Sequence, residues 1–444
     1  MMKQKLFVLL FAVLVAVAVQ FLDLSLSSQA KTVAGITVFA AILWFTDAVP
    51  LFATSLAIPV LLALFAGFTP AKAFAPFFDP LIVLLLGGAV LARALVRYEL
   101  DVVIVRFFLG LTGVKPKRFL LGLMLATAFV SMWISNTATA LMMMPIGVAA
   151  LAVTSLQPGK SSFGKAVVLG VAFAATIGGL GTLVGTPPNL IAANALEKFG
   201  VFVGFFEWSL KAAPVMIALL LAAWLVLCRM YAPEVEKIHI EKIKKKPLSL
   251  RQKTVLAVFA FTVVLWVTES VHGIHNSLVA LFPVFAFFAI DFLDADDFGK
   301  IGWDSLVLVG GGLSIGAAIS ASQLDVAIAG LFAGTVAGQP VFLTLVLAGL
   351  FMVFFTAFVP NTAGAAILLP LLLPLAPVLG VPVKSLALLA GMAVSFDFIV
   401  PTGTPPNAIA YGTRFIRVSD IIKAVLAVSL AGVLVVSVFA LFWF

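Results

Sequence analysis

Eleven long apolar runs dominate the chain and restrict it to very few folds. A run of about 17–25 apolar residues is long enough for a helix to cross a bilayer. Lipid offers no partner to backbone N–H and C=O groups, so a spanning segment must be a helix or part of a closed barrel. The runs therefore predict an all-α polytopic membrane protein with about 11 transmembrane helices. They lie near residues 5–22, 32–47, 50–68, 80–96, 166–199, 208–230, 254–272, 276–293, 304–322, 384–411 and 421–443.

Composition agrees with this fold class and excludes several others. Hydrophobic residues make up 63% of the chain and charged residues 10%. A soluble domain has about 45–50% hydrophobic and about 25% charged residues. The net charge of +8 comes from lysines and arginines in short loops, which is typical of a membrane protein rather than of a nucleic-acid-binding protein. The single cysteine, Cys228, excludes an intrachain disulfide and a Cys-x-x-Cys metal site.

Charge also predicts the orientation in the cell's inner (plasma) membrane. The loop PEVEKIHIEKIKKKPLSLRQK, residues 233–253, holds the densest basic cluster and is predicted to lie in the cytoplasm. Counting runs from this loop places the N-terminus in the cytoplasm and the C-terminus outside. The basic start and the apolar run within residues 1–31 are interpreted as an uncleaved first transmembrane helix. The arginines predicted to face the cytoplasmic interface, with attraction of the substrate as the alternative role, are Arg93, Arg97 and Arg106.

Four of the apolar segments are interrupted. The sequence Gly-Thr-Pro-Pro-Asn occurs at residues 185–189 and again at 403–407. Adjacent prolines forbid a regular helix at that point and leave carbonyl groups unpaired, so each copy predicts backbone that is opened around something polar. The segments 118–155 and 341–377 are interrupted near their middle by short polar sequences. Each of these predicts a re-entrant hairpin, in which two half-helices meet at a polar tip.

Landmark residues of the first half recur in the second half, 218 to 225 positions later. A collinear series of this kind indicates an internal repeat, and the loop count makes the second copy inverted. Inverted repeats with broken helices are typical of secondary transporters, whose binding site lies near the midplane. The pairs are Trp44 and Trp266, Pro59 and Pro283, Asp79 and Asp304, Asn136 and Asn361, Pro145 and Pro370, and Asn189 and Asn407. The predicted units are repeat 1 at 32–230, with a broken helix at 166–199, a cytoplasmic linker at 231–253, and repeat 2 at 254–444, with a broken helix at 384–411.

The four interruptions carry the candidate chemistry. Each is expected to present the N-terminus of a half-helix, whose free N–H groups and positive dipole end favour anions. Small hydroxyl and amide side chains there suit a carboxylate, and freed backbone carbonyls suit sodium. No lysine or arginine lies in any of the four motifs. A co-bound cation would supply the missing positive charge, which favours symport.

The motifs SNTATALMMMP and PNTAGAAILLP, together with the two GTPPN loops, resemble those of the divalent anion:sodium symporter family. This family includes sodium-coupled dicarboxylate, citrate and sulfate carriers. Residues 395–403, SFDFIVPTG, resemble its later Ser-x-x-Phe-x-x-Pro signature. The resemblance covers nearly the whole chain, and it implies a homodimeric transporter whose transport domain moves like an elevator against a scaffold.

The resemblance also implies the site residues. Those expected at the substrate are Ser135, Asn136, Thr137, Thr186, Pro187, Asn361, Thr362, Thr404 and Pro405. Those expected at a first sodium ion are Ser131, Ser135, Asn136 and the carbonyl of Gly185. Those expected at a second sodium ion are Thr356, Asn361 and the carbonyls of Val359 and Gly403. Sodium is thus the implied coupling ion.

Two positions depart from the family pattern. Pro360 stands where most relatives have serine, so a hydroxyl and an N–H are lost at the second hairpin tip and the second carboxylate contact is weakened or replaced. Asp397 is an acid within a strongly apolar run, close to the second Pro-Pro motif. An intramembrane acid is a functional candidate, here for the second cation site or for carrying a proton. The structural alternative is a hydrogen bond from Asp397 to a neighbouring helix.

The leading hypothesis is a sodium-coupled importer of C4-dicarboxylates such as succinate, malate or fumarate. A proton-coupled dicarboxylate symporter, an anion exchanger and a carrier of sulfate or citrate on the same fold are the alternatives. An ion channel would need a continuous polar path, whereas the sequence predicts paired dead-end hairpins. A membrane-embedded enzyme would need a nucleophile with its base, or metal ligands, at membrane depth, and the motifs contain neither.

Overall fold

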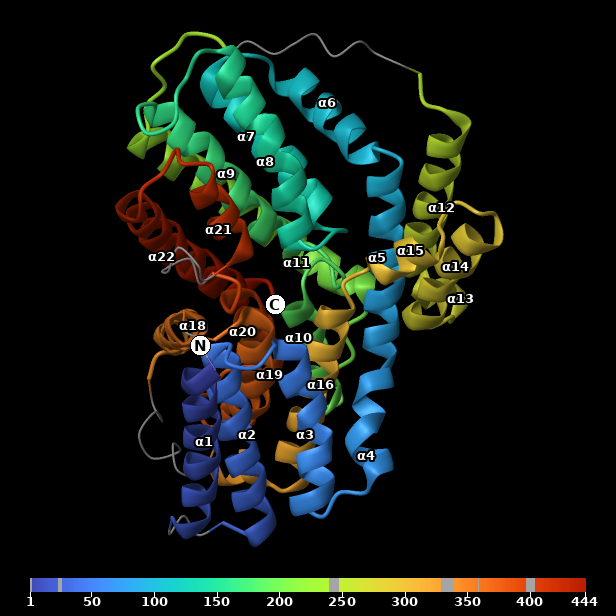
Figure 1. Ribbon diagram of the computed structural model, residues 1–444, viewed down its shortest axis with the longest axis vertical. Coiled ribbons are helices and arrows are strands. Elements are labelled where there is room, and N and C mark those ends of the chain that lie inside the picture. The colour runs from blue at the N-terminus through green and yellow to red at the C-terminus, as the bar shows by residue number, and fades with distance from the viewer. Residues whose placement is uncertain (1, 23–25, 239–246, 329–338, 358, 397–403) are drawn as a thin grey trace.

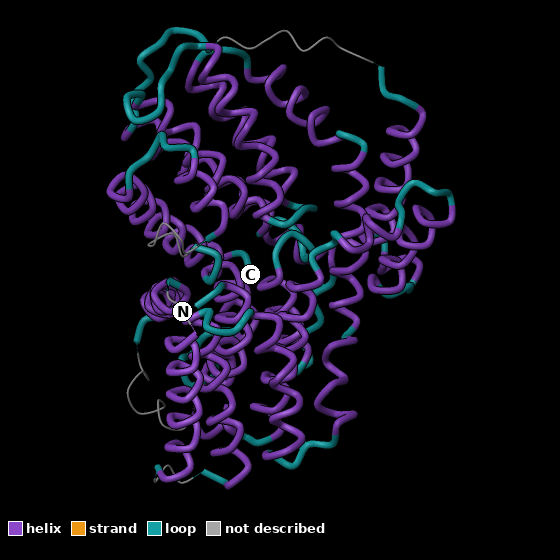
Figure 2. The backbone as a smooth tube through the Cα atoms, viewed as in Figure 1, coloured by secondary structure: helices purple, strands orange, loops and turns teal. Residues whose placement is uncertain are grey.

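The computed structural model describes residues 2–22, 26–238, 247–328, 339–357, 359–396 and 404–444. Within these ranges the chain forms helices joined by loops and turns, and no strand (Figure 2). Nine of the described helical segments are long and apolar enough to cross a membrane. The predicted all-helical, multi-span fold is therefore confirmed.

The helices follow the predicted runs closely. In the first half they are α1 Met2–Ala18, η1 Val19–Phe21, α2 Ser28–Thr46, α3 Leu51–Phe65, α4 Pro70–Phe74, η2 Ala75–Phe78, α5 Pro80–Arg97, α6 Leu100–Thr112, α7 Pro116–Ser131, α8 Asn136–Val153, α9 Ser162–Gly179, α10 Pro187–Glu197 and α11 Phe205–Met230. In the second half they are α12 Leu250–Val267, α13 Glu269–His272, α14 Asn276–Ala289, α15 Ala295–Gly299, α16 Trp303–Ala321, α18 Val341–Thr356, α19 Asn361–Leu372, η3 Leu373–Leu375, α20 Val383–Ala393, α21 Pro405–Gly412 and α22 Val418–Phe442.

Each of the four interrupted segments forms two helices, as the sequence predicts, although the Pro-Pro pairs begin α10 and α21 and do not lie in the breaks. Helices α7 and α8 form the two arms of the first hairpin, and α18 and α19 those of the second. The predicted run 166–199 is split into α9 and α10, and the predicted run 384–411 is split into α20 and α21. In Figure 1, α1, α2 and α3 lie side by side at one end of the molecule, and α6 to α9 lie at the other. Helices α10, α19 and α20 lie between these two groups.

Corresponding helices of the two halves make the same contacts. Trp44 at the end of α2 donates from Nε1 to the carbonyl of Leu51 (3.3 Å), at the start of α3. Trp266 at the end of α12 donates from Nε1 to the carbonyl of Asn276 (3.0 Å), at the start of α14. Both indole rings are buried. The same side chain therefore closes the same helix–helix corner in each half.

The halves also exchange partners, because α5 packs against α14 and α16 packs against α3. Glycines allow the close approach in both places. A Cβ atom at Gly87 of α5 would lie 2.2 Å from the carbonyl oxygen of Ala280, and one at Gly311 of α16 would lie 2.5 Å from the Cβ of Ser55. Small residues of this kind let membrane helices approach at backbone distance.

Candidate functional site

The first hairpin tip lies between α7, which ends at Ser131, and α8, which begins at Asn136. Ser135 is the N-cap of α8, and its hydroxyl oxygen accepts a hydrogen bond from the N–H of Ala138 (3.4 Å). This Ser135 side chain is exposed, whereas Asn136 and Thr137 are partly buried. The tip therefore presents small polar groups at the N-terminus of a helix, as the sequence predicts.

Oxygen atoms crowd behind this tip. The hydroxyl of Ser131 lies 2.9 Å from Oδ1 of Asn136 and 2.5 Å from the carbonyl oxygen of Ala175 in α9. The hydroxyl carries one proton, so it can donate to only one of these acceptors at a time. The Ser131 side chain is fully buried. Three oxygen atoms around a single proton form a surrounding that a small cation stabilises.

Two glycines at the break of α9 complete this oxygen cluster. A Cβ atom at Gly179 would lie 2.4 Å from Oδ1 of Asn136, and one at Gly185 would lie 2.5 Å from the carbonyl oxygen of Gly179. The structure therefore brings together three residues predicted at the first sodium ion, Ser131, Asn136 and Gly185. Gly179 and the carbonyl of Ala175 were not predicted. The paired glycines at the end of the apolar run were the available signal for Gly179.

Asn189 has a different place from the one expected for a ligand-facing polar side chain. Its side-chain nitrogen donates to three carbonyl groups at the break between α9 and α10. The acceptors and their distances are Gly179 (2.9 Å), Leu180 (3.4 Å) and Thr182 (2.7 Å). Trp208 of α11 adds a hydrogen bond from Nε1 to the carbonyl of Leu180 (3.0 Å). The unwound backbone is thus held open by side chains that replace the missing helical N–H groups.

The two Pro-Pro pairs do not lie inside the breaks. They form the first turns of α10 and α21, and the breaks precede them. Proline suits the first turn because its missing N–H has no helical partner there. The next N–H group in each helix is also occupied, since Asn189 N donates to the carbonyl of Thr186 (3.2 Å) and Asn407 N to that of Thr404 (3.1 Å).

The expectation that all four breaks offer free N–H groups is therefore wrong for these two helices. Their positive dipole ends remain, but their first donors are absent or used. Of the four helices that follow the breaks, the hairpin helices α8 and α19 are the two that have no proline in the first turn.

The second hairpin differs from the first at its cap. Pro360 is the N-cap of α19 and provides no side-chain hydrogen bond, whereas Ser135 provides one to α8. Asn361 and Thr362, at the start of α19, are partly buried. The first turn of α19 therefore lacks the hydroxyl acceptor that its counterpart has.

The remaining predicted residues of the second half are only partly described. Thr356 is buried, and its hydroxyl donates to the carbonyl of Met352 (2.8 Å). Val359 and Thr404 are also buried, and Pro405 is exposed. Gly403 and Asp397, predicted at the second cation site, lie outside the described residues.

Packing links the breaks of one half to the hairpin of the other. Helix α10 packs against α19 and α20, and α21 packs against α8 and α9. The start of each Pro-Pro helix therefore belongs to the same helix bundle as the opposite hairpin. Among the described residues no group of three or more His, Cys, Asp or Glu side chains is placed to hold a metal ion.

A cavity of about 360 Å³ opens beside the first tip. Small-molecule sites commonly measure about 300–1,000 Å³. The tip contributes Ser135, the first Pro-Pro motif contributes Gly185 and Pro187, and α5 forms the opposite wall. Two basic residues also line it: Arg93, from α5, and Lys300, which precedes α16. Arg93 was expected at the cytoplasmic interface, with attraction of the substrate as the alternative. The lining residues described for this cavity include none from the second hairpin or from α21.

An all-helical membrane fold with two broken helices, two hairpins and uncharged polar groups gathered at a break defines a secondary transporter. The chain belongs to the sodium:sulfate symporter family, because the family model described as "Sodium:sulfate symporter transmembrane region" matches residues 3–444. It is therefore a multi-pass membrane protein of a family of sodium-coupled divalent-anion transporters, and not an enzyme.

Relatives agree with this assignment, and solved structures agree with the fold. The sodium-dependent dicarboxylate transporter SdcS of Staphylococcus saprophyticus is 31% identical over 450 residues, which cover 93% of this chain and 86% of that protein. An uncharacterized transporter of Haemophilus influenzae is 31% identical over 427 residues, covering 91% and 90%. The fold is similar to the YdaH transporter of Alcanivorax borkumensis (TM-score 0.61, 14% identity, 92% of this chain and 98% of that one). It is also similar to MtrF of Neisseria gonorrhoeae (TM-score 0.62, 14% identity, 96% and 97%).

Proposed function

We propose that this protein imports C4-dicarboxylates such as succinate, malate and fumarate, coupled to sodium. The observation that carries the proposal is the oxygen cluster of Ser131, Asn136 and the α9 break, which lies directly behind the polar tip of the first hairpin. Relatives that are 31% identical over more than 90% of this chain and are named sodium-dependent dicarboxylate transporters support the choice of substrate.

The cluster behind the tip is suited to sodium. Its atoms are hydroxyl, amide and carbonyl oxygens, which are the ligands that unwound transporter helices offer to sodium. The carbonyl of Gly185 joins this set in the proposal. A second ion is assigned, by resemblance to the family, to Thr356, Asn361 and the carbonyls of Val359 and Gly403. Asp397 is proposed to act near this second ion.

The hairpins are suited to the anion. Substrate carboxylates are proposed to bind at the starts of α8 and α19, because these helices begin without prolines in the first turn and with an asparagine and a threonine each. The missing cap at Pro360 leaves donors at the start of α19 without a serine hydroxyl acceptor, so a carboxylate can take that place. Thr186, Pro187, Thr404 and Pro405 are proposed as the side walls.

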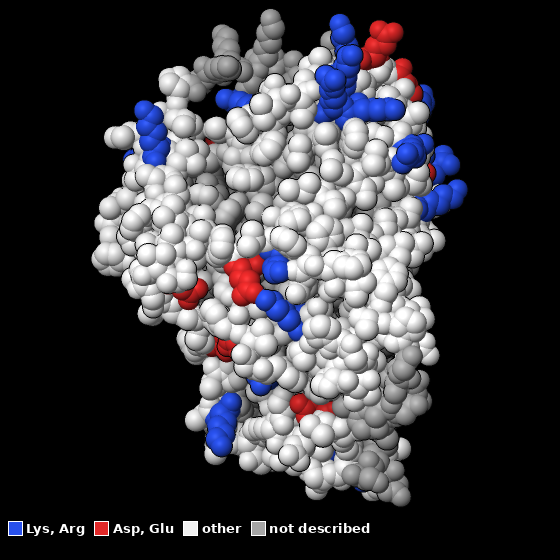
Figure 3. Space-filling view, turned by 180° about the vertical axis from the view of Figure 1, so that it is seen from behind, with Lys and Arg blue, Asp and Glu red and all other residues white. Residues whose placement is uncertain are grey.

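The arrangement in the membrane is part of the proposal. Lysine and arginine side chains gather at the end of the molecule where α6 and α7 lie (Figures 1 and 3), which supports a cytoplasmic position for that end. Residues 32–230 and 254–444 are proposed as inverted repeats joined by the linker 231–253, with the N-terminus inside and the C-terminus outside. We assign the homodimer and the elevator movement by resemblance to the family.

Uptake of radiolabelled succinate into proteoliposomes tests the function. Purified protein is compared with and without an inward sodium gradient at fixed pH, and Asn136→Ala and Asn361→Ala serve as site variants. Sodium-dependent uptake that both variants lose is the expected result.

Other outcomes contradict specific parts of the proposal. Uptake driven by a proton gradient and not by sodium would replace the coupling ion, and Asp397→Asn would then be the next variant. Uptake driven by an internal anion alone would indicate an exchanger. No succinate uptake under any gradient, with sulfate or citrate transported instead, would replace the substrate.

A further inference from the structure

The cavity beside the first hairpin tip is lined by two kinds of element. One wall is the tip itself, with the first Pro-Pro motif. The other wall is α5 with the segment that leads into α16. The four transport motifs contain no lysine or arginine, yet the facing wall provides Arg93 and Lys300. Positive charge therefore faces the site from elements that do not belong to it.

The guanidinium group of Arg93 is held in place. Its Nε and Nη2 atoms each lie 2.8 Å from Oδ1 of Asp297 in α15. Arg97, one turn further along α5, also pairs with Asp297, and it reaches Asp294 at 2.9 Å. The Asp297 side chain is only 2% exposed, whereas that of Arg93 is 25% exposed. Arg93 uses two of its five N–H donors on Asp297, so the others remain for a ligand.

Lys300 is the basic lining residue for which the described residues show no ion pair. Arg93 and Arg97 are matched by Asp297 and Asp294, and this group of four is neutral. Lys300 is the C-cap of α15, its side chain is exposed, and the ion pairs found among the described residues do not include it. The charged residues that line the cavity are both basic. A concave wall with one sign of charge raises the local concentration of the opposite ion.

We infer that Lys300 and Arg93 form a second anion subsite, on the wall of the cavity that faces Ser135, and that a dicarboxylate occupies this subsite as it enters or leaves the hairpin site. The inference rests on the proposed function, since it takes a divalent carboxylate as the ligand. Arg93 provides directed hydrogen bonds in a fixed orientation, and Lys300 provides the net charge. Asp297 is a positioning residue, because it holds the guanidinium at the wall.

Sodium-dependent binding of radiolabelled succinate to the purified full-length protein tests the subsite. Lys300→Ala removes the charge without breaking an ion pair found among the described residues, and Lys300→Glu reverses it. Arg93→Gln removes the guanidinium group, while Arg97 still pairs with Asp297. The matched control is Lys115→Ala. Lys115 is the N-cap of α7, its side chain is exposed, and it does not line the cavity.

The Kd for succinate is expected to rise about three- to tenfold in Lys300→Ala and Arg93→Gln, and further in Lys300→Glu. The differences in Kd between the variants and wild type should become smaller as choline chloride is added at constant sodium. Salt screens the interactions of exposed charges, with a screening length of about 10 Å at 0.1 M. Lys300→Arg should restore the wild-type Kd, which separates lost charge from lost folding.

Two results would overturn the inference in different ways. If wild type binds succinate and the Lys300 and Arg93 variants match Lys115→Ala at every salt concentration, the subsite is contradicted and the proposed function stands. If wild type binds no succinate in sodium, the proposed function fails and the inference fails with it.

Discussion

Gly179 has no room for a larger side chain at the first proposed sodium ion. A methyl group there would lie 2.4 Å from Oδ1 of Asn136, too close for contact. The Gly179→Ala variant should therefore turn the Asn136 side chain away from Ser131. Changes that displace a metal ligand in this way commonly lower metal affinity about 10–100-fold. We expect the sodium concentration for half-maximal succinate uptake to rise by about tenfold or more.

Gly110→Ala is the matched control for this change. Gly110 lies in α6, and a Cβ atom there has no other atom within 4 Å. Its sodium activation curve should equal that of wild type. A Gly179→Ala protein with the same curve would show that Asn136 does not need its present orientation to bind sodium.

At this site the residues that act through their backbone were harder to predict than those with a characteristic side chain, and Gly185 was expected only from the resemblance to the family. Asn136 belongs to a polar sequence inside an apolar run, and that contrast made it visible, whereas Ser131 was expected from the resemblance to the family. Ala175 contributes only a carbonyl oxygen, and every residue has one. Arg93 is separated from the tip in sequence and reaches it only through the packing of α5.

At the scale of elements, the break between α9 and α10 depends on one amide group. Asn189 donates to the carbonyls of Gly179, Leu180 and Thr182. The Leu180 carbonyl also accepts from Trp208 and the Thr182 carbonyl from the N–H of Gly185, so the carbonyl of Gly179 depends most on the amide. Each buried acceptor left unpaired costs about 1–3 kcal/mol. The Asn189→Ala variant should therefore have a clearly lower melting temperature in detergent and little sodium-dependent uptake.

Asn194→Ala provides the comparison on the same helix. Asn194 is partly buried, and its side chain donates to Asp79 (3.1 Å). Losing that bond should lower the melting temperature much less than losing the Asn189 side chain. Equal melting temperatures for the two variants would contradict the role assigned to Asn189.

The elements were largely predictable, because helices in lipid must satisfy their own backbone groups and so follow the apolar runs. Each hairpin and each broken helix was expected at its observed place. The role of the prolines was less predictable. A Pro-Pro pair can interrupt a helix or begin one. Which of the two occurs depends on whether the backbone carbonyls before the pair find other hydrogen-bond donors, as those before α10 do in Asn189 and Trp208.

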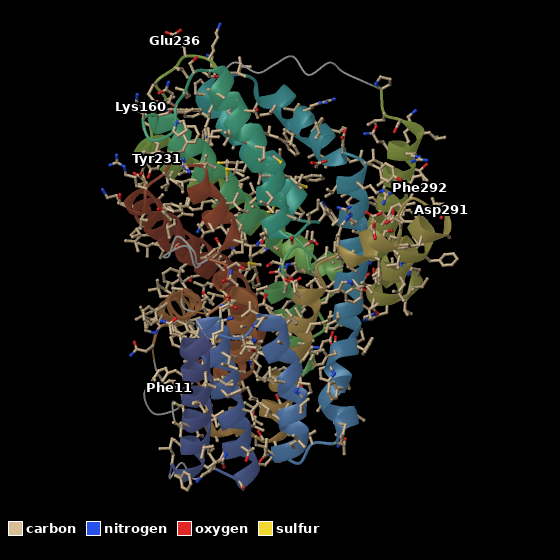
Figure 4. The ribbon with its side chains drawn as sticks, in the orientation of Figure 1. Phe11, Lys160, Tyr231, Glu236, Asp291 and Phe292 are labelled. Carbon is tan, nitrogen blue, oxygen red and sulfur yellow. The ribbon has the colours of Figure 1, made fainter. Side chains whose placement is uncertain are left out.

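At the scale of the whole molecule, the orientation can be tested with one cysteine at a time. Cys228→Ser removes the native thiol, and Glu236→Cys and Lys72→Cys place new ones at exposed positions. Glu236 lies at the end of the molecule that also carries Lys160 and Tyr231 (Figure 4), and Lys72 lies in α4 near the opposite end (Figure 1). A membrane-impermeant maleimide should label Lys72→Cys in intact cells and should not label Glu236→Cys.

Permeabilised cells provide the control for this labelling. Both thiols should react there, which shows that each is accessible from its own side. Labelling of Glu236→Cys in intact cells would reverse the proposed topology. The internal repeat was visible in the sequence because landmark residues keep their spacing, but the exchange of partners between α5, α14, α16 and α3 required the structure.

The proline starts of α10 and α21 have a consequence for leakage. A carrier that could hold its anion without its cation would let the anion run down its own gradient and waste the sodium gradient. The starts of α10 and α21, two of the four helix ends, cannot bind an anion through their first N–H groups, because those groups are missing or already bonded. On the proposed function, the carrier without sodium therefore binds the anion incompletely. The prolines thus help to couple the transport of the anion to the transport of sodium.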